Sequence, residues 1–202
     1  MRISDRMPDP ARDDVAIVLA GEWVAEDKRA AAQAVVAAWR AKPWPDGLLS
    51  LSLFVDVDGD RVLHYSQWTT ENPTLDLPGL AAYRLYRGDR HAEGRTPGAI
   101  VSVRVDTDGP EIARTWIDAV FDALAADRGL PSGGIGGFFH LSTDGSQVFN
   151  YAEWETAEAH RKALAANDGG VSRGPLWDKV RTMPGVHPRS VTRFHLYATL
   201  TR

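Results

Sequence analysis

The feature that most constrains this chain is an internal repeat. The segment DGDRVLHYSQWTT, residues 58–70, aligns without a gap with DGSQVFNYAEWET, residues 144–156, at an offset of 86 residues. The same offset aligns LSLFVDV (51–57) with GFFHLST (137–143). A register sustained in this way predicts that the chain contains two copies of one supersecondary unit.

Each copy is expected to begin with a strand followed by a helix. The apolar alternation in residues 15–19 and 100–105 is typical of half-buried strands, and the offset of 86 would place Val15 on Val101. Pro110 stands where a first helical residue would, and apolar residues then recur on one helical face. The members of this face are Ile112, Trp116, Val120 and Leu124, with Ala31, Val35 and Trp39 in the first copy.

Two further strands and a last strand complete each copy. The Asp-Gly pairs at 58–59 and 144–145 suit a hairpin turn, because both residues tolerate a positive φ. The closing strands, 83–86 and 194–197, align at an offset of 111 residues instead of 86. The first copy is therefore shorter than the second.

The additional segment in the second copy begins with ETAEAHRKALAA, residues 155–166, which reads as a helix ended by the Asn-Asp-Gly-Gly run at 167–170. The second copy is then a complete βαββαβ unit, and the first lacks most of its second helix. This order is the ferredoxin-like split βαβ topology. The predicted fold class is α+β, with two tandem ferredoxin-like repeats forming an internal dimeric α+β barrel.

The domain prediction follows from this repeat. Residues 1–13 lack periodicity and are expected to form a disordered tail. The truncated repeat occupies 14–90, the polar, turn-rich residues 91–98 form the linker, and the complete repeat occupies 99–202. The two repeats are expected to pair as an internal pseudo-dimer, and whether this pairs again as a homodimer is open.

Composition excludes several classes of function. The 202-residue chain has a formal net charge of −4, which argues against binding nucleic acid, and no run of residues is apolar enough to span a membrane. The absence of cysteine removes disulfides and thiolate metal sites, and the six histidines lack metal-ligand spacing. The sequence predicts a cytoplasmic protein with no metal, whose partner is a small molecule.

One strand of the second copy carries an unusual face. Side chains alternate along a strand, so Asn150, Ala152 and Trp154 share one face, while Tyr151 lies on the other. The Cα atoms of Asn150 and Trp154 should lie about 13 Å apart. Small Ala152 between them would leave room for a flat molecule, with a polar group at one end and an indole N–H at the other.

The tandem halves, the Asn-x-x-x-Trp strand and the helix that follows resemble the antibiotic biosynthesis monooxygenases of the dimeric α+β barrel superfamily. Members of this family oxidise anthrone-like aromatic polyketides to quinones with molecular oxygen and without metal, flavin or haem. The resemblance implies that this chain is such a cofactor-independent enzyme, with oxygen as co-substrate. It also implies that Asn150 and Trp154 hold and activate the substrate.

The remaining site predictions are tied to this pattern. His160, on the helix expected to cover the floor, is the candidate base, since the ordinary pKa of histidine lies near neutral pH. Ala152, Tyr151 and Arg173 are candidates for contacts with the substrate, Arg173 by clamping an acidic group. In the first copy His64 replaces the asparagine and Trp68 keeps the tryptophan, which suggests a vestigial site.

Two alternatives remain open at this point. One is a non-catalytic barrel that binds a small aromatic ligand or stabilises a biosynthetic complex. The other is a haem-degrading monooxygenase, but relatives of that kind carry an axial histidine later on the helix. Here His160 comes one turn too early and Leu164 occupies the later turn.

Overall fold

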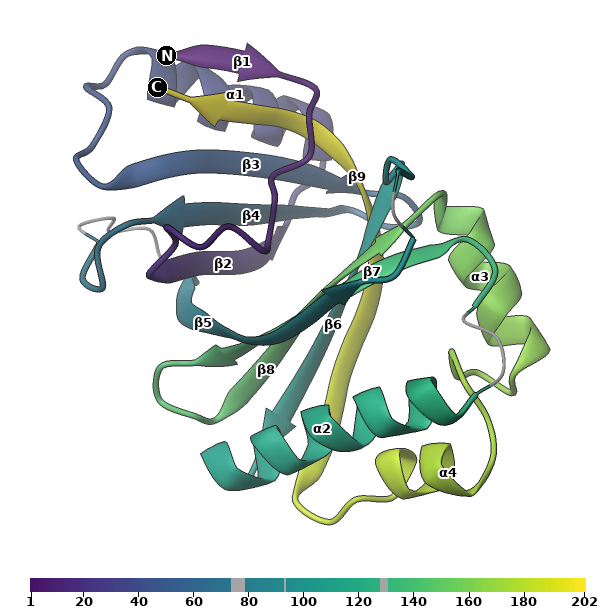
Figure 1. The fold of residues 1–202 in the computed structure, drawn as a ribbon. Coiled ribbons are helices and arrows are strands. Elements are labelled where there is room, and N and C mark those ends of the chain that lie inside the picture. The colour runs from purple at the N-terminus through teal and green to yellow at the C-terminus, as the bar shows by residue number, and fades with distance from the viewer. Residues whose placement is uncertain (74–78, 93, 128–130) are drawn as a thin grey trace. The chain divides into compact units, whose positions relative to one another are not determined.

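The computed structural model describes residues 1–73, 79–92, 94–127 and 131–202. The described residues form antiparallel strands and helices, which confirms the α+β class (Figure 1). The chain divides into two compact units. Unit 1 comprises Met1–Leu85 and Thr192–Arg202, and unit 2 comprises Tyr86–Val191.

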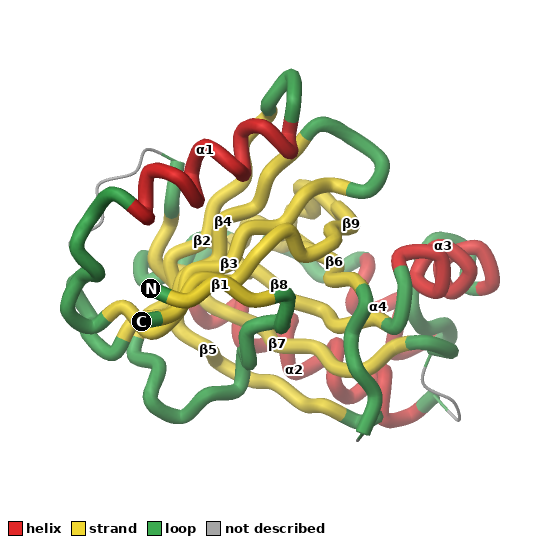
Figure 2. The backbone as a smooth tube through the Cα atoms, turned by 90° about the horizontal axis from the view of Figure 1, so that it is seen from above, coloured by secondary structure: helices red, strands yellow, loops and turns green. Residues whose placement is uncertain are grey.

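The described residues of unit 1 form one helix and an antiparallel sheet. Its strands lie in the order β1, β9, β3, β4, β2, β5, and β5 and β9 contribute only the residues that belong to this unit. Helix α1 contacts β3 and β4 and runs along the sheet of this unit (Figure 2). The elements are β1 (Arg2–Ser4), β2 (Ile17–Val24), α1 (Lys28–Arg40), β3 (Leu48–Asp56), β4 (Arg61–Trp68), β5 (Ala81–Arg90) and β9 (Val186–Thr201).

Unit 2 combines an antiparallel sheet with the other helices of the described chain. Its strands lie in the order β5, β7, β8, β6, and the first residues of β9 pair with β6. If the strands are counted from β2 in unit 1 and from β6 in unit 2, both units contain the spatial order second, third, first, fourth strand: β3, β4, β2, β5 in unit 1 and β7, β8, β6, β9 in unit 2. The elements are β6 (Ala99–Thr107), α2 (Pro110–Ala126), β7 (Gly134–Ser142), β8 (Gln147–Trp154), α3 (Ala157–Ala166) and α4 (Pro175–Arg181).

Local sequence explains where the helices begin. The Asp27 side chain accepts hydrogen bonds from the backbone N–H groups of residues 29 and 30 and caps α1. Pro110 occupies the first turn of α2, as predicted, where its missing N–H costs nothing. Thr156 caps α3 by accepting a hydrogen bond from the Ala159 N–H at 3.0 Å. The predicted hairpin turn at 144–145 is also present, with φ of 74° at Gly145.

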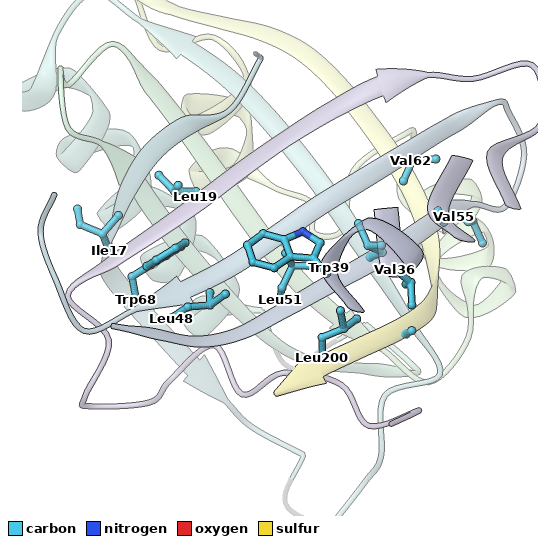
Figure 3. Packing of buried hydrophobic residues seen from close by; sticks show 13 residues of the cluster. Ile17, Leu19, Val36, Trp39, Leu48, Leu51, Val55, Val62, Trp68 and Leu200 are labelled. Carbon is cyan, nitrogen blue, oxygen red and sulfur yellow. The ribbon is translucent and has the colours of Figure 1, made fainter. Parts of the chain in front are cut away.

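The core of unit 1 lies between α1 and the sheet (Figure 3). Trp39 of α1 belongs to the same cluster as Leu51 of β3 and Trp68 of β4. All three side chains are buried, and their apolar surface supplies the main favourable contribution to folding of this unit. The α1 face of the unit 1 sheet is therefore densely filled.

Three sequence predictions need correction. The segment 1–13 is partly ordered, since β1 pairs with β9 and the Gln67 side chain donates to the Asp9 carbonyl at 2.6 Å. The first strands do not follow the offset of 86, because Leu19 and Val101 hold equivalent register positions opposite Ser66 and Ala152. Residues between 155 and 182 form two helices, and α4 was not predicted.

Other expectations concern the gaps between elements. Among the described residues between β4 and β5, none is helical, but 74–78 lie outside the described residues. Residue 93 of the expected linker lies outside them as well. Within the part of the chain that the structure describes, no helix combines the length and apolarity that crossing a membrane requires.

Candidate active site

Unit 2 contains a cavity of about 250 Å³ between its sheet and its three helices. Strands β6, β7 and β8 form the floor, and helices α2, α3 and α4 contribute the roof. All lining residues belong to unit 2. Most of them are apolar, including Val101, Val103, Trp116, Val120, Leu124, Ile135, Phe139, Leu164, Val171, Trp177 and Val180.

The pairing register places the floor residues in rows across the strands. Asn150 of β8 pairs with Val103 on one side and Phe139 on the other. Two residues further along β8, Ala152 pairs with Val101 and Gly137. All of these residues line the cavity, so the face of β8 that was predicted from alternation is the face that lines the cavity.

Asn150 supplies a polar group to this apolar floor. Its Oδ1 is buried and has no hydrogen-bond partner among the described residues. An unpaired buried amide oxygen costs free energy, and natural structures keep such groups where a ligand or water completes them. Asn150 is therefore suited to bind a polar substituent of a ligand in the cavity.

Trp154 and His160 form the wall beside this floor. The two rings contact each other edge to face, with centroids 4.8 Å apart and an interplanar angle of 72°. Trp154 is 5% exposed and His160 is 2% exposed, and both line the cavity. The helix α3 thus places the predicted base against the predicted tryptophan, as the sequence suggested.

Two predicted contacts lie elsewhere. Tyr151 is fully buried on the opposite face of β8, where it pairs with Phe138 and Ser102, so it does not line this cavity. Arg173 is exposed in the loop before α4 and is not a lining residue. The arginine that lines the cavity is Arg181, at the end of α4.

The suspected vestigial site in unit 1 is closed by its own hydrogen bonds. The Trp68 indole N–H donates to the Ser66 hydroxyl at 3.0 Å, and His64 Nε2 lies 2.9 Å from the same oxygen. Burial lowers the pKa of His64 from 6.5 to about 4, so its ring is neutral at pH 7. Unlike Asn150, His64 has a protein partner.

A buried ion pair lies next to the floor in sequence. The Arg90 guanidinium donates to both carboxylate oxygens of Glu153, each at 2.8 Å. The Glu153 side chain is 1% exposed, and it stands between Ala152 and Trp154. This bidentate pair ties β5 to β8 and fixes the strand that carries the site residues.

The sequence did not identify several cavity residues. Trp177 lines the cavity from α4, and its buried Nε1 has no hydrogen-bond partner within the described chain. Gly137 lies in the floor opposite Ala152. Gly137 belongs to the SGGIGG run. The sequence indicated its position only in that Gly137 and Phe139, two residues apart on one strand, must share a face.

Comparisons with known proteins identify the fold. No family model matches the chain, and no curated protein matches it. Among solved structures, an anthrone oxidase-like protein superposes with a TM-score of 0.70 at 14% identity, over 99% of this chain and 96% of that one.

Two other solved structures superpose less closely. A “putative monooxygenase” of Fusobacterium nucleatum gives a TM-score of 0.57 at 8% identity, over 93% and 95% of the two chains. A major regulator of staphylococcal pathogenesis gives 0.54 at 8% identity, over 88% and 98%. The resemblance drawn from the Asn-x-x-x-Trp strand thus holds for the fold, which the chain shares with anthrone oxidase-like and monooxygenase-like proteins.

Proposed function

We propose that unit 2 is a cofactor-independent monooxygenase that oxidises an anthrone-like aromatic polyketide with molecular oxygen to a quinone. The observation that carries the proposal is the cavity floor, where Asn150, whose amide oxygen has no partner among the described residues, and the indole of Trp154 flank the small Ala152. The fold shared with an anthrone oxidase-like protein supports it. The two units act in this proposal as tandem ferredoxin-like repeats of an internal dimeric α+β barrel.

The cavity suits one fused aromatic ring system. Its volume of about 250 Å³ lies just below the roughly 300–1,000 Å³ typical of small-molecule sites. Its lining is mostly apolar, and the polar or charged side chains in it are His91, Asn150, Glu153, His160 and Arg181. Such a lining binds a flat ring by burying apolar surface and orients it through one or two polar contacts.

In the proposed reaction the protein binds the substrate and removes one proton, and the substrate anion itself reacts with oxygen. His160 takes the benzylic proton of the anthrone, and the resulting carbanion delocalises its charge onto the carbonyl oxygen of the anthrone. This anion passes one electron to oxygen, the radical pair combines to a peroxide at the same carbon, and loss of water leaves the quinone. One anthrone and one oxygen molecule give one quinone and one water, so atoms and electrons balance.

Asn150 and Trp154 are assigned to hydrogen bonds with different oxygens of the substrate, which stabilise the negative charge as it develops on the substrate carbonyl. Hydrogen-bond donors held in place before the reaction stabilise such an anion without having to reorganise. The Asn150 Nδ2–H group and the Trp154 indole N–H are the two donors, one at each end of the floor, whereas the unpaired Asn150 Oδ1 can only accept a hydrogen bond, for example from a substrate hydroxyl. Both groups should therefore affect turnover more than substrate binding.

The test is oxygen uptake by the purified protein with dithranol or emodin anthrone, corrected for uncatalysed autoxidation. We expect Asn150→Ala and Trp154→Phe each to lower kcat by about 10²–10³-fold, the usual effect of removing one oxyanion donor. Trp68→Phe is the matched control, because it removes the same N–H from the equivalent repeat position in unit 1. Its kcat should equal that of the unsubstituted protein.

The same data separate an enzyme from a binding protein. If the unsubstituted protein produces no oxygen uptake above autoxidation but binds these anthrones, with affinity lost in Asn150→Ala, the non-catalytic binding function replaces the proposal. Equal losses of kcat in Trp68→Phe and Trp154→Phe would contradict the assignment to unit 2.

Independence from cofactors is tested by removing them. We expect protein dialysed against a chelator, and shown to be free of flavin and haem by its absorption spectrum, to retain its full rate of oxygen uptake. The carbanion supplies the electron that a cofactor would otherwise provide. Loss of the rate on dialysis, with recovery on adding back a metal ion, would contradict this part of the proposal.

A further inference from the structure

A row of small residues crosses the floor of the unit 2 cavity. Val101, Ala152 and Gly137 are paired neighbours on β6, β8 and β7, and all three line the cavity. Neighbouring strands lie about 4.8 Å apart, so this row spans roughly 10 Å across the sheet. Trp154 stands on one side of the row and Asn150 on the other.

The equivalent row in unit 1 is filled by larger side chains. Leu19, Ser66 and Leu51 occupy the same register positions on β2, β4 and β3. Leu51 is fully buried and belongs to the cluster that contains Trp39 of α1 (Figure 3). The position that carries a leucine side chain in unit 1 therefore carries none in unit 2.

The backbone does not require glycine at position 137. A Cβ placed there would meet a carbon of the Phe139 ring at 3.5 Å and Asn150 Oδ1 at 3.6 Å, which are ordinary contact distances. Gly136 differs, because its Cβ would lie 2.8 Å from the Asp89 carbonyl oxygen. Gly137 also lacks the positive φ that favours glycine elsewhere in the chain.

The missing side chain at 137 thus leaves space in the cavity, beside the unpaired Asn150 oxygen. We propose that Gly137 is a specificity-determining residue, which limits the number of fused rings that lie flat across the row of Val101, Ala152 and Gly137. This proposal rests on the proposed function, since it concerns the same cavity. It assigns the site to planar systems of at least three fused rings, whose outer ring lies over Gly137.

Graded substitutions test this assignment by binding alone, without turnover. The variants are Gly137→Ala and Gly137→Leu. The second introduces the residue found at the equivalent position of unit 1, Leu51. Ala34→Leu is the control, because it adds similar bulk at an exposed position of α1. The probes are dihydroxynaphthalene, with two rings, and dihydroxyanthraquinone, with three, and binding is followed by quenching of tryptophan fluorescence.

We expect Gly137→Ala to weaken binding of the three-ring probe about tenfold or more, since one added methyl in an apolar pocket discriminates by roughly 10–200-fold. Binding of the two-ring probe should change less. Gly137→Leu should abolish three-ring binding, and Ala34→Leu should change neither affinity. The unfolding midpoint of each variant shows whether it is folded. If Gly137→Leu does not fold, the affinities of Gly137→Ala for the two probes test the proposal alone.

Unchanged affinity for the three-ring probe in a folded Gly137→Leu protein would overturn the proposal, and so would equal weakening of both probes in Gly137→Ala. Failure of the proposed function looks different. In that case the probes still respond to residue 137, but the unsubstituted protein consumes no oxygen with any anthrone.

Discussion

Acidification from pH 7 to pH 4 is expected to lower the free energy of unfolding by about 6 kcal/mol, with about 3 kcal/mol from each of two buried histidines. Burial lowers the pKa of His64 from 6.5 to about 4. Burial also lowers the pKa of His140 to about 4. Hydrogen bonds from its Nδ1–H to the Phe149 and Phe138 carbonyls oppose this shift, and the charge of nearby Arg104 adds to it. Both rings are nearly inaccessible to water.

The direction follows from which state binds protons. Between pH 6.5 and pH 4 the unfolded chain protonates these histidines and the folded chain does not, so stability falls as the pH falls through this window. The Asp144 carboxylate adds to the loss at lower pH, because its pKa is lowered by hydrogen bonds from the Ser142 and Ser146 hydroxyls and from the Ser146 N–H.

Urea unfolding at a series of pH values measures the effect. His64→Asn, which installs the residue found at the equivalent position of unit 2, should remove about half of the loss between pH 7 and pH 4. His187→Asn is the control, because His187 is exposed. An unchanged pH dependence in His64→Asn would show that His64 does not stay neutral in the folded protein.

Removing the partner of Glu153 is expected to cost about 3 kcal/mol of stability. In Arg90→Met the Glu153 carboxylate stays buried at 1% exposure without its cation, and breaking a buried pair from one side costs about 3–5 kcal/mol. The lower end of this range applies because the Arg90 side chain is 36% exposed and interacts partly with water. Chemical denaturation of the variant measures the loss.

The double variant separates the pair from the packing. Glu153→Leu alone should cost less than Arg90→Met, because water can solvate the remaining guanidinium. Arg90→Met with Glu153→Leu should recover part of the stability lost in Arg90→Met. If the two single losses simply add in the double variant, the two side chains do not interact energetically.

Local patterns predicted most of the fold. The repeated Asp-Gly turns, Pro110 and the helix after Trp154 are short-range signals, and each appears in the structure where it was expected. Strand β1 was not predicted, because Arg2–Ser4 is ordered by pairing with residues 199–201 of β9. No local pattern in residues 1–13 reports a partner so distant in the sequence.

Alternation along one strand predicted the centre of the candidate site. The face shared by Asn150, Ala152 and Trp154 follows from the period of a strand, and the helical position of His160 follows from the segment after it. The prediction for Arg173 was wrong because α4, which begins at Pro175, was not predicted, and the cavity is lined by Arg181 at the end of that helix. The role of Gly137 required the register between β7 and β8, which only the structure gives.

The passage of β9 from unit 2 into unit 1 affects the order in which a growing chain can fold. Residues 86–191 are continuous, so unit 2 has all its residues as soon as Val191 is synthesised. Unit 1 still lacks residues 192–202, and the edge of β3 that pairs with them offers unpaired N–H and C=O groups until then. Domains that emerge first from the ribosome usually fold first. In this protein the unit that begins at the N-terminus must be the last to finish.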